Sequence, residues 1–324
     1  MNLPVFDARL VPVEVEAEET NVLLKMIGRM ELAAKAKTEK QAAEALQDAI
    51  PAAGKRSGQG QFPFFLDDDT AALPNHLART PLFSPVPWVQ PGPPIKAGRW
   101  ERHERIRHLR VKLASPEGVA MWYTGEQLDM TDQDVFMLAL KFAQSIDLGT
   151  PVRRNRSEFL KAFGWKPSSK RGSFGTSAYQ WLDESFDRLT SAKLSTTTKR
   201  WTSHLVLVSS WIQDDQTREW EFTLDRKILQ PFQNDEFSFV DLEKRGKIAK
   251  RVHMAKWLQS YAVSHQRGLH RVGLANLKEW CGYRSPMRKF RETLREALDE
   301  LSRVDVLVNI EFYKNETMVK WMRS

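Results

Sequence analysis

The sequence predicts an α+β protein with two tandem winged-helix domains, each a helix-turn-helix followed by a β-hairpin wing, behind a flexible N-terminal region. Two observations predict this fold. Three helical segments followed by two strands occur twice between residues 119 and 324. Short motifs within the two copies also match in the same order. We expect a largely flexible leader, linker and basic segment over residues 1–115, a first winged-helix domain over 116–236 and a second over 237–324.

The N-terminal region divides into a leader, a linker and a basic segment. Residues 1–20 are rich in proline and acids, and Thr20 or Asn21 could cap a marginal helix running towards Ile50. Residues 51–61 contain three glycines among small, polar and basic residues, which is typical of a flexible linker. A later run of cations could line a phosphate backbone, although such runs are often only solvated. Its members are Lys96, Arg99, Arg102, Arg105, Arg107, Arg110 and Lys112.

The charge distribution indicates a polyanionic partner. The 324 residues carry a formal charge of +8. The first fifty residues hold 6 cations and 9 acids, a charge of −3, so the rest of the chain carries +11. A basic body behind a mildly acidic leader is typical of proteins that bind nucleic acid.

Cysteine content and hydropathy indicate the cellular compartment in which the protein works. Cys281 is the only cysteine, which excludes an internal disulfide and a multi-cysteine zinc site. No apolar run approaches the length of a membrane span, and the N-terminus lacks a signal-peptide pattern. We expect a cytoplasmic protein without a membrane partner.

The first copy begins with a strand over Val119–Tyr123 that stops at Gly125. Thr131 and Asp134 resemble a capping box for a buried helix from Val135 to Ser145. Two further helices and a hairpin through Asp214-Asp215-Gln216 complete the copy. The expected elements are helices over Ser157–Phe163 (stopped by Gly164) and Thr176–Leu194, and strands over His204–Val208 and Arg218–Leu224.

The second copy repeats this order and contains the most informative stretch of the chain. Its expected elements are helices over Ile248–Ser264, Leu274–Cys281 and Pro286–Ser302, and strands over Val304–Phe312 and Thr317–Met322. Ser285 is expected to cap the long helix, with Pro286 at its first position. The front half of that helix is crowded with cations, although acids would suit the helix dipole better there. A basic helix start after a glycine-containing turn favours insertion into a DNA major groove over a merely solvated face.

Two motif pairs indicate an internal duplication. Phe159-Leu-Lys-Ala-Phe-Gly164-Trp165 aligns with Leu277-Lys-Glu-Trp-Cys-Gly282-Tyr283, and Glu184-Ser-Phe-Asp-Arg-Leu189-Thr190 aligns with Glu296-Ala-Leu-Asp-Glu-Leu301-Ser302. The offset falls from 118 to 112 residues, so the first copy has six extra residues in the loop around Lys166–Gly175. Chance similarity of two amphipathic helices explains this less well than duplication, because the element order also agrees.

The duplication predicts the symmetry of the target. Two related but non-identical DNA-binding domains in one chain can occupy consecutive stretches of one duplex asymmetrically. A two-fold symmetric dimer of a single domain would instead require a palindrome. We therefore expect a non-palindromic target.

The candidate DNA-binding residues lie at the starts of the second helix-turn-helix helices and at the second wing tip. Arginine is the usual partner of guanine in the major groove, and the remaining cations suit phosphates. In the second domain they are Arg284, Ser285, Arg288, Lys289, Arg291 and Arg295, with Lys314 and Asn315 at the wing tip. In the first domain they are Lys170, Arg171, Ser173, Thr176, Ser177, Tyr179 and Gln180. Because only Lys170 and Arg171 are cationic there, we expect the first domain to contribute less affinity.

Several motifs resemble plasmid replication initiators of the TrfA type, within the larger group of twin winged-helix Rep proteins. The motifs are Leu73-Pro-Asn-His76, Ala78-Arg-Thr-Pro-Leu-Phe83, Tyr123-Thr-Gly-Glu-Gln-Leu128, Phe159–Trp165 and Trp280-Cys-Gly282. The resemblance covers about Gln61 to the C-terminus. It implies binding to directly repeated origin sites (iterons), opening of a nearby A·T-rich region with single-stranded origin DNA as a further partner, and recruitment of the host initiator, helicase and sliding clamp. Related initiators switch between monomer and dimer, which leaves both states open here.

The same family carries a clamp-binding Gln-x-x-Leu-Phe peptide just before its first winged domain. Gln61, Phe62, Phe64 and Phe65 occupy that place here, with Phe64 in the leucine position and Pro63 inside the motif. Independently of the resemblance, a short aromatic segment on a flexible tether is how linear peptides dock into grooves.

Enzyme classes find no support in the sequence. There is no P-loop, no Rossmann fingerprint and no metal-ligand spacing among the seven histidines, so we expect no catalytic residues, no metal and no cofactor. A winged-helix transcriptional regulator or autorepressor remains an alternative because fold alone does not choose. A nuclease or relaxase is a disfavoured third class. The tryptophans on apolar faces are expected in the core: Trp122, Trp165, Trp181, Trp257 and Trp280.

Overall fold

The computed structural model describes residues 62, 67, 69–86, 105–115, 118–168, 173–214, 219–249 and 251–324, without the side chains of 230, 231 and 233–235. The leader, the linker and most of the aromatic peptide lie outside this range, as do Lys96, Arg99, Arg102, Lys170 and Arg171. Within the described residues, no helix is long and apolar enough to cross a membrane.

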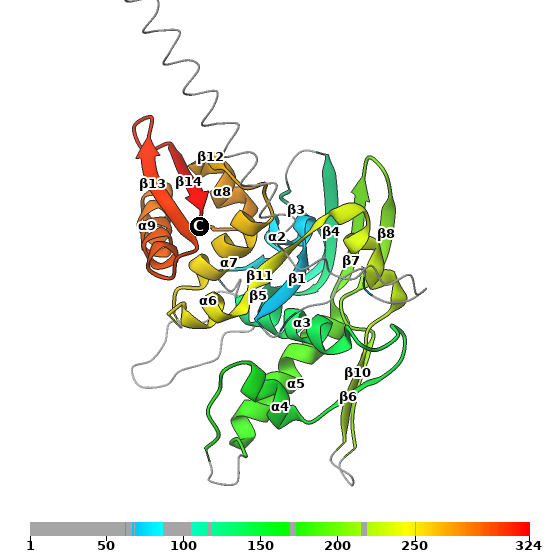
Figure 1. The fold of residues 1–324 in the computed structure, drawn as a ribbon. Helices are drawn as coiled ribbons and strands as arrows, with labels where there is room; N and C mark the ends of the chain where they lie inside the picture. Colours follow the sequence, from blue (N-terminus) through cyan, green and yellow to red (C-terminus); the bar gives the residue numbers. More distant parts are fainter. Residues whose placement is uncertain are drawn as a thin grey trace, which may run out of the picture. The chain divides into compact units, whose positions relative to one another are not determined.

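The second winged domain has the predicted order of elements (Figure 1). Its helices are α7 (His253–Val263), α8 (Leu274–Trp280) and α9 (Met287–Arg303), and its strands are β12 (Leu269–Gly273), β13 (Leu307–Tyr313) and β14 (Met318–Arg323). The strands form an antiparallel sheet in the order β12-β14-β13, so the strand before α8 completes the wing.

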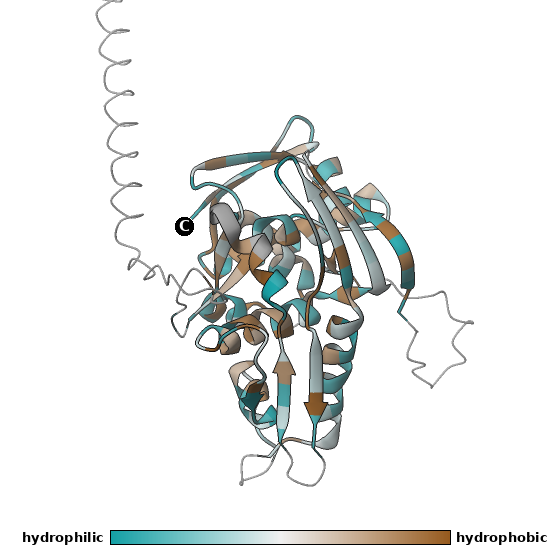
Figure 2. Ribbon diagram, turned by 90° about the vertical axis from the view of Figure 1, so that its right-hand side faces the viewer, coloured by the Kyte–Doolittle hydropathy of each residue, from teal (hydrophilic) through white to brown (hydrophobic). Residues whose placement is uncertain are grey.

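The first winged domain repeats this arrangement. Its helices are α3 (Met130–Ala143), α4 (Arg156–Ala162) and α5 (Thr176–Ser191), and its strands are β6 (Val152–Arg154), β9 (Ser210–Gln213) and β10 (Trp220–Thr223). The sheet order β6-β10-β9 corresponds to β12-β14-β13. Burial alternates along the wing strands, between exposed and half-buried in β9 and between buried and half-buried in β10, as expected for a sheet with one covered face. Figure 2 shows hydrophobic and hydrophilic residues interspersed along the helices and strands of the fold. The predicted duplication of the winged-helix fold is confirmed.

The first copy differs by an inserted hairpin between its last helix and its wing. This hairpin consists of β7 (Lys193–Thr198) and β8 (Thr202–Val206), which join β3 (Arg107–Leu113) and β4 (Val119–Glu126) in a four-stranded sheet. The sequence predicts His204–Val208 as the first wing strand, and this is wrong because that segment pairs with β7. The true wing strand β9 pairs with β10 from Trp220↔Gln213 to Thr223↔Ser210.

Segments that the sequence assigns to the leader belong to the folded unit. Strand β1 (Thr70–Pro74) pairs with β11 (Phe237–Asp241), and β2 (Phe83–Ser84) pairs in parallel with β5 (Leu128–Asp129). Helix α2 (Asn75–Ala78) lies between β1 and β2, while the 3₁₀ segment η1 (Arg226–Asp235) and helix α6 (Leu242–Lys247) flank β11. The expectation of a largely flexible region up to residue 115 is therefore corrected for residues 70–84 and 107–113.

Three predicted helix starts are displaced. The capping box of α3 uses Asp129 and Asp132, not Thr131 and Asp134, because the Asp129 carboxylate accepts the Asp132 amide while Asp132 accepts the Asp129 amide. The cap of α9 is Pro286, without a side-chain hydrogen bond, so Ser285 is not the cap. The helix predicted from Ile248 begins at His253 instead.

Candidate nucleic-acid interface

Both helix-turn-helix units turn in the same way, at Gly164 and Gly282. These glycines have φ of +78° and +71°, a conformation that favours glycine. In each copy the glycine amide donates to the carbonyl three residues earlier, and the next amide donates to the carbonyl five residues earlier. The N···O distances are 2.8 and 3.1 Å in the first copy and 3.0 Å for both bonds in the second. The aligned motifs thus produce the same turn, which sets the angle between the two helices.

The start of α9 presents a cluster of cations. Arg284, Arg288 and Lys289 are exposed, whereas Phe290 on the opposite side of the helix is buried. The Arg288 side chain is 78% exposed and pairs with Glu292 at 3.0 Å, an i,i+4 pair of small energetic weight. Arg291 is half-buried, and its Nε has no hydrogen-bond partner. Cations that are this accessible suit an external anionic partner.

Arg295 connects α9 to the wing. Its guanidinium pairs with Glu316 at 2.5 Å and lies 4.9 Å from the centre of the Phe312 ring. Lys314 and Asn315 occupy the exposed wing tip with φ of 51° and 54°. Arg295 therefore positions the wing beside α9, while Lys314 and Asn315 project beyond it.

The start of α5 carries hydroxyl and amide groups instead of cations. Thr176, Ser177 and Gln180 are exposed, as is Ser173 just before the helix. Gln180 donates to Glu184 at 3.2 Å, one turn along the helix. With the offset of 112 residues, Thr176 and Ser177 correspond to Arg288 and Lys289 of α9, whereas Ser173 and Gln180 correspond to Ser285 and Glu292.

Tyr179 lies inside the first helix-turn-helix. Its ring is half-buried under the Arg156 guanidinium at 4.9 Å, and its hydroxyl bonds Ser157 at 2.8 Å and accepts the Phe174 amide at 3.3 Å. Tyr179 therefore holds the start of α4 against the start of α5 and offers less surface to a partner than Thr176 or Gln180.

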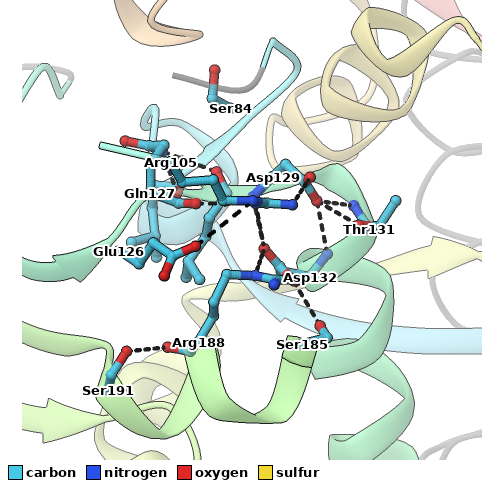
Figure 3. Close-up of polar contacts among 12 residues, drawn as sticks. Ser84, Arg105, Glu126, Gln127, Asp129, Thr131, Asp132, Ser185, Arg188 and Ser191 are labelled. Carbon is cyan, nitrogen blue, oxygen red and sulfur yellow. Dashed lines mark hydrogen bonds and ion pairs between the residues drawn. The ribbon is translucent and has the colours of Figure 1, made fainter. Parts of the chain in front are cut away.

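A buried ion network anchors α5 from behind, and sequence reasoning missed it (Figure 3). Asp132 on α3 is fully buried and accepts from Arg188 on α5 at 2.8 Å, Ser185 at 2.6 Å and Arg105 at 3.2 Å. Arg105 also pairs with Asp129 at 2.6 Å. Burial alone would raise the pKa of Asp129, but Arg105 and the Thr131 hydroxyl hold it below its ordinary value.

This network removes one residue from the candidate phosphate contacts. Arg105 belongs to the predicted basic run, yet its guanidinium is committed to buried carboxylates. Charged residues are rarely fully buried without a partner. The available signal was therefore the pair of acids, Asp132 and Asp134, directly before the apolar run 135–140, because buried acids require cations from elsewhere in the chain.

The aromatic peptide contributes one described side chain. Phe62 is 1% exposed and packs edge-on against Phe232 at 5.3 Å between ring centres. Gln61, Phe64 and Phe65 lie outside the described residues. Phe62 stands at an unspecified position of the clamp motif, and its side chain is buried in the fold.

The tryptophan prediction holds in part. Trp257 is buried, but Trp165 is 38% exposed and lies against Trp181 at 4.8 Å between ring centres. Trp122 is half-buried on the outer face of the four-stranded sheet, with the Arg110 guanidinium 4.9 Å from its ring centre. Trp165 and Trp122 are therefore not core residues. Among the residues that the structure describes, no group of three His, Cys, Asp or Glu could hold a metal ion.

Comparisons with known proteins identify one family and several similar folds. A family model described as TrfA protein matches residues 31–323. The solved structure of Pi initiator protein in complex with iteron DNA is 15% identical, with a TM-score of 0.46 over 61% of this chain and 92% of that one. Domains 2 and 3 of RctB are 12% identical, with a TM-score of 0.45 over 68% and 92%. No curated protein sequence matches the chain.

Proposed function

The chain belongs to the TrfA family, as its motifs predict, and from this premise we propose that it is a plasmid replication initiator that binds directly repeated sites in an origin. One observation carries the proposal: two helix-turn-helix units with the same turn geometry and different exposed side chains occur in one chain. Such a pair suits an asymmetric site, and directly repeated asymmetric sites suit successive molecules that bind in the same orientation.

In the proposed complex, the start of α9 enters a major groove. Arg288 or Arg284 contacts a guanine edge, while Lys289 and Arg291 contact phosphates. Arg295 holds the wing so that Lys314 and Asn315 reach the adjacent backbone. Thr176, Ser177, Gln180 and Ser173 face the next stretch of duplex, with Lys170 and Arg171 supplying the cations of that half.

Origin opening would require a preference for one melted strand, and the outer face of the four-stranded sheet suits that partner. Lys112, Trp122 and Ser195 face outwards in one row, Lys193 lies in the next row, and the Arg110 guanidinium lies 4.9 Å from the centre of the Trp122 ring. A hollow of about 450 Å³ lies over Arg110, Trp122 and Lys193. Cations beside an aromatic ring are the usual composition of surfaces that bind single strands. Helix α5 packs on the other face of this sheet.

Host proteins complete the proposal. The peptide around Gln61, Phe64 and Phe65 would bind the sliding clamp, and the host initiator and helicase would be recruited to the opened origin. We expect Phe64→Ala with Phe65→Ala to abolish clamp binding without changing DNA affinity. Clamp binding that persists in this double variant would refute the peptide assignment.

The experiment that tests the proposed function is replication in trans. A plasmid lacking its own initiator, but carrying the segment that flanks this gene, is expected to be maintained only in cells that supply the protein. Loss of the plasmid despite tight and specific binding near a promoter would favour the alternative, a winged-helix regulator or autorepressor. Nicking of supercoiled DNA with a divalent metal would indicate the nuclease or relaxase class instead.

A further inference from the structure

Helix α3 carries two buried acids, Asp132 and Asp134, with the buried Gln133 between them. Residues two apart on a helix point in nearly opposite directions. The two carboxylates therefore leave α3 on different sides. Each meets a cation from another element.

Asp132 connects α3 to helix α5 of the first winged domain. Its partner Arg188 is on α5, one turn before the end of the helix whose start presents Thr176 and Gln180. Both oxygens of Asp132 accept from the Arg188 Nε at 3.1 and 3.2 Å, which fixes the direction of the contact as well as its distance.

Asp134 connects α3 to helices α6 and α7 of the second winged domain. It pairs with Arg245 on α6 and, at 2.5 Å, with Lys256 on α7. Arg245 is 3% exposed and also donates to Gln133 on α3 at 2.8 Å. Two neighbouring residues of α3 therefore accept hydrogen bonds from one guanidinium. Ser260 on α7 donates to the same Gln133 at 3.0 Å.

From α6 the contacts continue to α9. Arg303, at the end of α9, donates to the Lys247 carbonyl at 2.6 Å, and Glu300 accepts the Ala249 amide at 2.6 Å. Lys244 on α6 donates to the Asp305 carbonyl just beyond α9, also at 2.6 Å. Helix α3 thus lies one ion pair from α5 and is connected to α9 by one ion pair and a short set of hydrogen bonds.

We propose that α3 sets the separation and phase of the two DNA-binding helices, and that the contact of Asp134 with Arg245 and Lys256 determines which spacing of half-sites the protein accepts. This inference rests on the proposed function. Along B-DNA, one extra base pair moves a groove contact by about 3.4 Å and turns it by about 34°. A rigid connection between α5 and α9 would therefore reject a half-site displaced by one base pair.

The chemistry of the contact favours this role over a purely stabilising one. Buried ion pairs add little stability compared with apolar side chains of similar size, but their geometry is directional. An apolar interface would permit small rotations between the two domains. The Arg245 guanidinium is held at two of its nitrogens, by Asp134 and by Gln133, while the second oxygen of Asp134 accepts from Lys256, and such directional contacts resist rotation.

The test uses the full chain and a double variant, Asp134→Leu with Arg245→Met, which removes both buried members of the contact together and leaves only the partly exposed Lys256 ammonium without its carboxylate. The duplexes contain the repeat obtained by selection, with zero or one base pair inserted between the two half-sites. For the unaltered protein we expect the insertion to weaken binding about tenfold or more. The double variant should bind both duplexes within about threefold of each other. A variant that retains the full penalty would overturn the proposal.

A control variant and a distance measurement test whether the effect is specific to the contact of Asp134. Lys247→Met removes an exposed ion pair with Glu243 on the same helix α6, so it should keep the full spacing penalty. Spin labels at Lys161→Cys on α4 and Asp299→Cys on α9 should report a broader distance distribution in the double variant than in the Lys247→Met protein. Both label sites are exposed, whereas Cys281 is buried. An equally narrow distribution in the double variant would overturn the inference.

Failure of this inference and failure of the proposed function give different results. If the unaltered protein selects no repeated site, the proposed function fails before any spacing is tested. If it selects a repeat, yet tolerates inserted base pairs as the double variant does, the proposed function stands and the role of Asp134 is refuted.

Discussion

The starts of α5 and α9 occupy the same position in the two winged domains but present different exposed side chains. Around α9 the exposed side chains are Arg284, Arg288 and Lys289, whereas around α5 they are hydroxyls and the Gln180 amide. The turns that precede the two helices have the same hydrogen bonds. This difference indicates that the fold places both helix starts for contact with DNA, and that their side chains give the two domains different roles in binding. Cations bind any duplex strongly, while neutral groups at the same place discriminate without adding much non-specific affinity.

The two domains also differ in what lies behind these helices. A buried ion network of Asp132, Arg188 and Arg105 anchors α5. Behind α8 and α9 lies a cluster of Tyr261, His265, His270, Trp280 and Trp321. In the first domain the corresponding aromatic cluster holds only Phe and Trp. Its members are Phe142, Phe159, Phe186, Trp220 and Phe222.

The largest expected effect concerns the anchor of α5. Asp132→Asn leaves Arg188 and Arg105 buried without their shared carboxylate, and we expect the free energy of unfolding to fall by about 3–5 kcal/mol. Urea denaturation measures this loss. Asp299→Asn on the exposed face of α9 is the matched control and should be neutral within about 0.5 kcal/mol. Equal midpoints for the two variants would contradict the assigned role of the network.

The next effect tests base recognition by α9. Arg288→Ala should cost about 1–3 kcal/mol on the selected repeat and relax specificity at one base pair. Titration of the repeat and of random duplex in the same buffer separates the two contributions. If binding to both duplexes falls equally, Arg288 contacts only phosphate.

Acid should weaken the second domain before the first. Burial and Arg79 lower the pKa of His265 to about 4, and burial also lowers the pKa of His270. The unfolded pKa is near 6.5, so below that pH the unfolded chain binds protons that the folded domain excludes. Stability is complete above about pH 6.5 and is lost as the pH falls towards 4. At pH 5 we expect a loss of about 1–2 kcal/mol for His265, reduced by its partial exposure.

Hydrogen exchange of individual amides checks this prediction. Between pH 7 and pH 5, after correction for intrinsic rates, protection should fall in α7 and β12 more than in α4 and β10. His265→Phe should flatten the difference between the domains. Equal loss in both domains of the unaltered protein would show that these histidines do not control acid stability.

The smallest expected effect distinguishes the two helix starts by salt dependence. Gln180→Ala should cost about 0.5–1.5 kcal/mol on the repeat without changing the slope of log K against log salt. Lys289→Ala should lower that slope by about 1. Binding titrations at several salt concentrations give both values. A reduced slope for Gln180→Ala, or none for Lys289→Ala, would reverse the division of work proposed for the domains.

The sequence predicts most of what is local. The turns at Gly164 and Gly282 were readable because a left-handed residue after a helix favours glycine. The repeated Glu-x-x-Asp-x-Leu motif located α5 and α9 because their apolar faces have the same period. The exposed cations of α9 followed from composition and spacing alone.

The sequence could not predict what depends on distant partners. His204–Val208 alternates like a wing strand, and nothing local shows that it pairs with β7 instead of β10. Two overlapping capping patterns start at Asp129 and Thr131, and the choice depends on Asp134, whose carboxylate meets Arg245 across 111 residues. The burial of Arg105 and Phe62 likewise depends on Asp132 and Phe232, which are far along the chain.

The measurement that tests the central claim most directly is selection of bound duplexes from random DNA, followed by footprinting on the plasmid segment that flanks the gene. Two non-identical winged domains in tandem predict an asymmetric site that recurs as direct repeats in phase with the helical turn. Within each repeat, the half-site protected by the second domain should be the one lost in Arg288→Ala. A single palindrome would contradict the account, because it would mean that two copies of one domain read the DNA.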